Sequence, residues 1–152
     1  MKSISLRNLI IMIQRIQSIW LLLAAACVFG SYALPLYEGH LQNNSIKSFF
    51  IPDSFLLFPL IFGLGLLAII CIFLFKKRNL QFRLSIFGTL FSILAIVLEY
   101  IKSADFKTAN NFQSGSYHLG ALIPFAMAFF FIMAARGIYK DEKLVKSMDK
   151  LR

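Results

Sequence analysis

Charged residues are scarce in this chain of 152 residues, and acidic ones are scarcest, with 7 Asp and Glu against 16 Lys and Arg. Charged residues make up 15% of the sequence, whereas a soluble domain carries roughly 25%. This shortage excludes a soluble enzyme and a soluble nucleic-acid-binding domain, so no nucleic-acid partner is expected. Cysteine is scarce as well, with 2 residues, which excludes a disulfide-rich secreted domain.

Motifs that carry chemistry are also missing. The sequence has no Gly-rich phosphate loop, no paired-cysteine motif and no His-Glu-x-x-His pattern. Ionisable residues in the middle of a membrane span are costly and tend to be functional, but the polar residues at that depth are only Ser31, Thr89 and Ser92. We therefore expect no enzyme activity and no cofactor, and neither a proton relay nor an ion-coupled carrier.

The ionisable residues near the ends of the apolar runs leave one metal site open as an alternative. Its ligands would come from one side of the membrane and comprise Glu38, His40, Glu99 and His118. The favoured interpretation is that these side chains form hydrogen bonds at the interface, so we expect no bound metal. Haem would need facing histidines within the apolar runs, and the sequence has none there.

Apolar residues, by contrast, are abundant. They make up 59% of the chain, which includes 17 phenylalanines and has a mean hydropathy of +0.73. Four runs have about the 20 residues that cross a bilayer core: 13–36, 54–75, 84–101 and 119–139. Backbone groups in lipid must be paired within the segment, so these runs are predicted to be helices. We predict an all-α membrane protein, a single domain over 1–152, with four transmembrane helices as two antiparallel hairpins.

Basic residues predict how the four spans are oriented. Thirteen of them would share one side with both termini: Lys2, Arg7, Arg15, Lys76, Lys77, Arg78, Arg83, Arg136, Lys140, Lys143, Lys146, Lys150 and Arg152. The other side would hold only Lys47, Lys102 and Lys107. Because cytoplasmic loops carry the excess of Lys and Arg, both termini and the tail 140–152 are predicted to be cytoplasmic, with loops 37–53 and 102–118 outside.

The beginning of the chain allows a second interpretation. Basic residues precede an apolar stretch that contains Ala24-Ala25-Ala26-Cys27, as in a signal peptide with a lipidated cysteine. The apolar run continues to Leu36, however, and the apolar region of a cleaved signal is only about 7–15 residues long. An uncleaved span is the favoured interpretation.

Small and aromatic residues predict how the parts of the chain meet. Gly88 and Ser92 stand four residues apart in the third run, a spacing that lets helix backbones approach closely in lipid. Aromatic residues of the two outer loops are expected to pack the loops together or to lie among lipid headgroups: Phe49, Phe50, Phe106, Phe112 and Tyr117.

Polar residues at the cytoplasmic ends of the spans are the candidate interaction site. Gln14, Arg15 and Gln17 begin the first span, and Arg136 ends the fourth. In the tail, apolar residues that include Leu144 and Met148 recur at helical spacing. This set, which comprises Gln14, Arg15, Gln17, Arg136, Leu144 and Met148, would contact a partner. The alternative is that the basic residues only anchor the helices in the headgroup layer.

The two ends of the sequence also carry a family resemblance. The run from Met12 to Ala24 and the close from Lys140 to Arg152 resemble the opening and the ending of a family of small bacterial inner-membrane proteins, domain of unknown function 4293. The resemblance implies four spans and an inner-membrane location, without an activity or catalytic residues. Members typically begin where Met12 stands, so it leaves open whether Met1 or Met12 is the native start.

Two functions from different classes fit this sequence. The first is a non-enzymatic accessory or scaffold subunit of a membrane complex, whose partners are the lipid bilayer and another inner-membrane protein or a second copy of the chain. The alternative is a small oligomeric transporter or channel, which needs several copies because four apolar helices leave little room for a pore. A lipid-handling protein is the third possibility.

Overall fold

The computed structural model is mostly helical and describes residues 2–41, 45–75, 77–110, 112 and 114–149, with side chains described within 16–143. The prediction of four helices is confirmed. They are α1 (Lys2–Ala33), α2 (Leu57–Phe73), α3 (Arg78–Asn110) and α4 (Ile123–Asp149). Short 3-10 turns, Ile51–Asp53 and Leu119–Leu122, lead into α2 and α4. Proline is tolerated in the first turn of a helix, which is where Pro59 and Pro124 lie.

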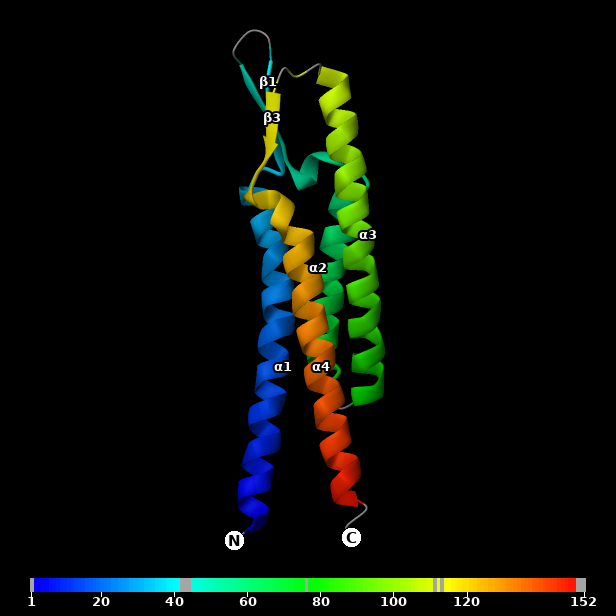
Figure 1. Ribbon diagram of the computed structural model, residues 1–152. Helices are drawn as coiled ribbons and strands as arrows, with labels where there is room; N and C mark the ends of the chain where they lie inside the picture. Colours follow the sequence, from blue (N-terminus) through cyan, green and yellow to red (C-terminus); the bar gives the residue numbers. More distant parts are fainter. Residues whose placement is uncertain (1, 42–44, 76, 111, 113, 150–152) are drawn as a thin grey trace.

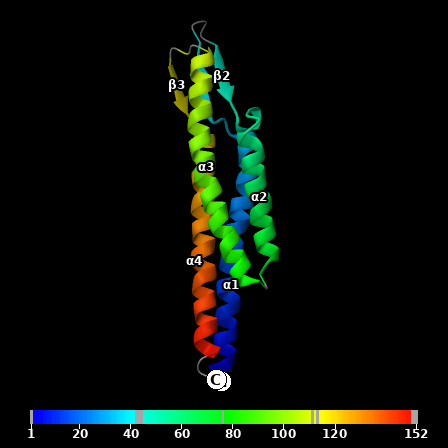
Figure 2. The same cartoon turned by 90° about the vertical axis from the view of Figure 1, so that its right-hand side faces the viewer.

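The four helices form a ring in which each helix packs along its two neighbours, α1 on α2, α2 on α3, α3 on α4 and α4 on α1. Both ends of the chain lie at one end of the bundle, called the terminal end below, and the strands lie at the other, the sheet end (Figure 1). At the terminal end α1 and α4 extend together beyond the turn between α2 and α3 (Figures 1 and 2).

The outer surface of the bundle is apolar, as expected for a membrane protein. Exposed apolar side chains occur along every helix, among them Leu22, Phe73, Phe87 and Phe129. Soluble monomers rarely expose continuous apolar surface on this scale. Three helices, α1, α3 and α4, contain segments long and apolar enough to cross a membrane. The fourth, α2, has 17 residues, which is the lower limit of the usual range.

Helix α3 is longer than the predicted span 84–101. It begins at Arg78, shortly after the end of α2 at Phe73, and it continues through residues 102–110 of the expected outer loop. Hydropathy falls after Ile101 because the side chains become polar, but polar residues such as Lys102 and Asp105 still form helix. Their side chains pair at 3.0 Å across one turn. The end of an apolar run therefore marked the end of the span and not of the helix.

The two predicted outer loops meet in a three-stranded antiparallel sheet of order β2-β1-β3. Strands β1 (Tyr37–His40) and β2 (Ile46–Phe49) form a hairpin between α1 and α2. Strand β3 (Ser114–Tyr117) follows α3 and pairs with β1, so that Tyr37 faces Tyr117. The sheet therefore ties the α1–α2 hairpin to the α3–α4 hairpin.

Alternation along the strands gives the sheet an aromatic face and a polar face. The aromatic face packs on the end of α3 through an aromatic cluster of Tyr37, Phe49, Phe106, Phe112 and Tyr117. Phe49 stacks on Phe106 with ring centroids 4.8 Å apart, and Tyr37 meets Tyr117 edge-on at 5.2 Å. Packing between the loops is therefore realised for four of the five predicted residues, all except Phe50, and Tyr37 joins them.

Small side chains let the helices approach closely inside the bundle. The buried residues of α3 recur at helical spacing and form one face of the helix: Gln81, Ser85, Gly88, Ser92, Ala95, Glu99 and Ser103. Gly88 faces the fully buried Phe131 of α4, and a Cβ atom built on Gly88 would lie 2.6 Å from that ring. The three buried serines of α3, which are Ser85, Ser92 and Ser103, donate hydrogen bonds to carbonyls of their own helix. Their hydroxyl groups are therefore hydrogen-bonded, although they lie in the core.

The substitution Gly88→Ala is expected to destabilise the bundle by about 1–3 kcal/mol, because Phe131 is buried and must shift to admit the new methyl group. Gly63→Ala in α2 is the matched control, since a Cβ there has no neighbour within 4 Å. Unfolding of both variants in mild detergent measures the difference. Equal stability of the two variants would contradict the close α3–α4 contact.

Candidate functional site

The terminal end of the bundle has a groove between α1 and α4, called the α1/α4 groove below, with a volume of about 380 Å³. It brings together two of the predicted interaction residues, Gln17 from α1 and Arg136 from α4. Its full lining comprises Ile16, Gln17, Trp20, Met133, Arg136, Gly137 and Lys140. The other four predicted residues, Gln14, Arg15, Leu144 and Met148, have side chains outside the described part of the chain.

Gly137 positions Gln17 at the base of this groove. A Cβ atom on Gly137 would lie 2.7 Å from Cγ of Gln17, so only glycine allows the glutamine side chain to pass this close to α4. Gln17 is consequently buried, with 3% of its surface exposed, and its Nε2 has no hydrogen-bond acceptor among the described residues. A buried donor without an acceptor costs about 1–3 kcal/mol, so an acceptor bound in the groove would stabilise this site.

Trp20 forms a wall of the α1/α4 groove one turn from Gln17. Its ring stacks on Phe130 and meets Phe129 edge-on, with centroid distances of 6.0 Å in both cases. These contacts hold the indole against α4. The lining of the groove therefore combines the buried amide of Gln17 with the aromatic ring of Trp20 and the cation of Arg136.

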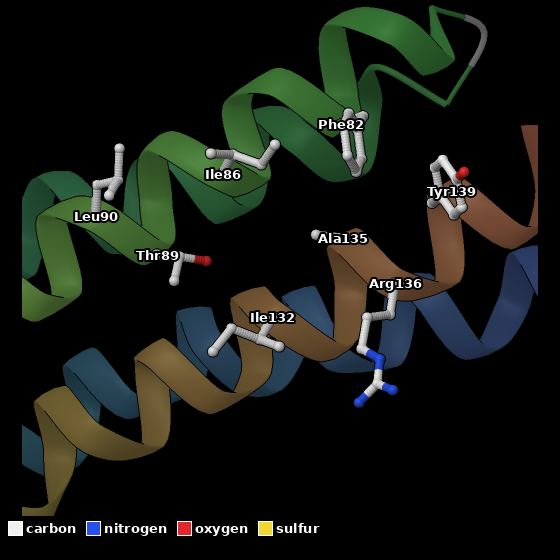
Figure 3. A pocket seen from close by; sticks show the side chains of 8 residues that line it. All are labelled: Phe82, Ile86, Thr89, Leu90, Ile132, Ala135, Arg136 and Tyr139. Carbon is white, nitrogen blue, oxygen red and sulfur yellow. The ribbon is translucent and has the colours of Figure 1, made fainter.

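A second groove lies between α3 and α4 and is called the α3/α4 groove (Figure 3). Its volume is about 370 Å³, and its lining comprises Phe82, Ile86, Thr89, Leu90, Ile132, Ala135, Arg136 and Tyr139. Arg136 belongs to both grooves. In Figure 3 its side chain extends away from Phe82 and Ile86, which lie on α3. The side chain of Arg136 therefore lies between the two grooves, and its guanidinium group extends away from α3.

The polar face of the sheet carries a small hydrogen-bonded group at the opposite end of the molecule. His118 Nε2 lies 3.1 Å from Glu38 Oε2 and 3.3 Å from Ser116 Oγ, and Ser48 donates to Glu38 Oε1 at 3.1 Å. A catalytic relay needs the acid and the serine on different ring nitrogens of the histidine, but here both are on Nε2. This arrangement is a surface network and not a nucleophile with its base.

The alternative of a metal site receives no support from the described residues. Glu38 and His118 are brought together, but no group of three or more His, Cys, Asp and Glu side chains converges within the part of the chain that the structure describes. Glu99 is buried inside the bundle, with 4% of its surface exposed and Oε2 without a partner. Both cysteines, Cys27 and Cys71, are free.

Sequence reasoning missed a charged contact at the terminal end. Arg78 Nη1 at the start of α3 lies 3.2 Å from Oδ2 of Asp141, whose side chain is 3% exposed. One turn further along α3, Gln81 donates to the backbone carbonyl of Cys71 at 3.0 Å. Asp141 belongs to the predicted tail 140–152. The signal for Gln81 and Glu99 was present, since both lie on the stripe of buried small residues that contains Gly88 and Ser92.

Comparisons with known proteins give one match. The model of a family described as a domain of unknown function (DUF4293) matches residues 13–151. No curated protein and no solved structure matches the chain.

Proposed function

The chain belongs to the family of domain of unknown function 4293, and from that starting point we propose that it is a non-enzymatic accessory or scaffold subunit of a membrane complex. In this proposal the bundle spans the bacterial inner membrane with both termini in the cytoplasm. Its support is the excess of basic residues at the terminal end, which include Lys77, Arg83, Lys140 and Lys143.

The exposed edge of the sheet is the observation that carries this proposal. All four residues of β3 are exposed. The backbone N–H of His118 donates to Leu36 at 3.0 Å, and hydrogen-bonded pairs alternate along an antiparallel ladder. It follows that Gly115 and Tyr117 direct their N–H and C=O groups away from β1. A partner strand can pair with this edge through backbone hydrogen bonds.

The interior of the bundle favours a subunit over a transporter. Its core at mid-depth consists of packed apolar side chains such as Leu21, Ile61, Ala95 and Phe131, all fully buried. The described serines in the core are paired with their own helix carbonyls, and both grooves of the terminal end lie on the outside of α4. A single copy therefore has no polar path between its ends within the described residues.

The test is co-purification of the tagged full chain after gentle extraction from native membranes. We expect a second protein in stoichiometric amount, at the total mass of a defined complex. Tyr117→Pro removes the outward N–H of the β3 edge and is expected to lose this partner. Tyr117→Ala removes the same ring but keeps the N–H, so it should retain the partner.

Two outcomes would overturn the proposal. A pure oligomer of this chain would support the transport alternative instead. A lone chain, recovered with its sheet intact by amide hydrogen exchange, would show that no protein partner binds.

A further inference from the structure

We propose that the α1/α4 groove and the α3/α4 groove together bind one anionic phospholipid, with its phosphate at Arg136 and an acyl chain in the α3/α4 groove. These grooves lie at the terminal end, opposite the strand edge. The inference rests on the membrane location in the proposed function, but it does not depend on a protein partner at the strand edge.

The polar groups that line the α1/α4 groove favour the binding of an anion. Most of them are hydrogen-bond donors: the buried Nε2 of Gln17, the indole N–H of Trp20, the guanidinium of Arg136 and the ammonium of Lys140. The amide oxygen of Gln17 is an acceptor. Among the residues whose side chains are described, no carboxylate lines the groove. Asp141, the next residue after Lys140, is turned toward Arg78 of α3. Phosphate oxygens would accept from these donors and would supply the acceptor that Gln17 lacks.

The α3/α4 groove calls for an apolar chain attached to that anion. Apart from Arg136, its lining is apolar except for the hydroxyl groups of Thr89 and Tyr139 (Figure 3). It opens on the outside of the bundle, because Leu90, Ile132 and Tyr139 are each more than two-fifths exposed. A free phosphate would leave this groove empty, and an acidic protein segment would bring no hydrocarbon chain to it. A phospholipid supplies both the anion and the hydrocarbon chain, and Arg136 lies between the two grooves that would hold them.

The test uses the full chain purified in mild detergent, titrated with dioleoylphosphatidylglycerol or dioleoylphosphatidylcholine and analysed by native mass spectrometry. We expect one tightly retained molecule of the anionic lipid and weaker retention of the zwitterionic one. Arg136→Gln is expected to weaken binding of the anionic lipid about tenfold, since it removes the guanidinium group that would bind the phosphate. Gln17→Met keeps the packing on Gly137, removes the buried donor and is expected to weaken binding about fivefold.

Arg83→Gln is the matched control, because Arg83 is an exposed arginine of α3 at the same end that lines neither groove. It lowers the net charge as much as Arg136→Gln does and should leave lipid binding unchanged. Equal weakening by the two variants would overturn the site, because it would show attraction to general positive charge. Release of the lipid by inorganic phosphate, or replacement of the lipid by a co-purified protein at this groove, would overturn the assignment to a phospholipid.

Discussion

Replacing Arg78 by glutamine is expected to lower the free energy of unfolding by about 3–5 kcal/mol, the largest loss that we predict for a single substitution. The carboxylate of Asp141 is 3% exposed and pairs with Arg78 at 3.2 Å. Without the arginine, a buried negative charge has no cation beside it, and such a charge is far costlier than the intact pair is stabilising. Thermal or urea unfolding in mild detergent measures this loss.

The reverse substitution, Asp141→Asn, is the control and should cost much less. Arg78 is 30% exposed, so its guanidinium group can be solvated once the carboxylate is gone. The double variant, Arg78→Gln with Asp141→Asn, should recover most of the stability that Arg78→Gln alone loses, because no buried charge remains. If Arg78→Gln and Asp141→Asn cost the same small amount, Asp141 is solvated and this contact does not hold α3 to α4.

Phe106→Ala is expected to detach the sheet from α3, with a local loss of about 3 kcal/mol. Phe106 stacks on Phe49 at 4.8 Å and contacts Tyr37 and Phe112, so its ring lies at the centre of the aromatic cluster. Amide hydrogen exchange should accelerate in β1, β2 and β3 while the part of α3 inside the bundle stays protected.

Phe55→Ala is the matched control for this prediction. Phe55 is 95% exposed, so removal of its ring should leave exchange in the sheet unchanged. Uniform acceleration over all four helices in Phe106→Ala would contradict a local role for the cluster. Unchanged exchange in the strands would mean that the strand pairing alone holds the sheet.

The helices were predictable because a long apolar run can pair its own backbone groups in a medium without water only by forming a helix. The sheet was not predictable. Its strands have four residues each, which is too short for a pattern of alternation, and the pairing of Tyr37 with Tyr117 joins segments that are distant in sequence. Such a pairing depends on where the packed helices place the two loops in space, and the local sequence of either loop does not predict it.

The candidate site was predictable in part for a similar reason. Gln17 and Arg136 were predicted because both are polar side chains at the same predicted end of the spans, and the structure brings both to one groove. The roles of Gly137 and Trp20 depend on which helix lies beside α1, and this neighbour is α4. The residue pattern of a single helix does not show which other helices lie beside it.

The pairing of β1 with β3 has a consequence for the order in which the protein is made. Strand β1 is complete early in translation, but its partner β3 emerges only after α2 and α3. During that interval β1 has β2 alone, and a two-stranded hairpin is marginally stable in water. The aromatic face of the sheet also has no packing partner until Phe106 and Phe112 have been synthesised. The sheet therefore closes late in biogenesis, and a ribosome that stalls between Arg78 and Asn110 would leave an open hairpin exposed to chaperones and proteases.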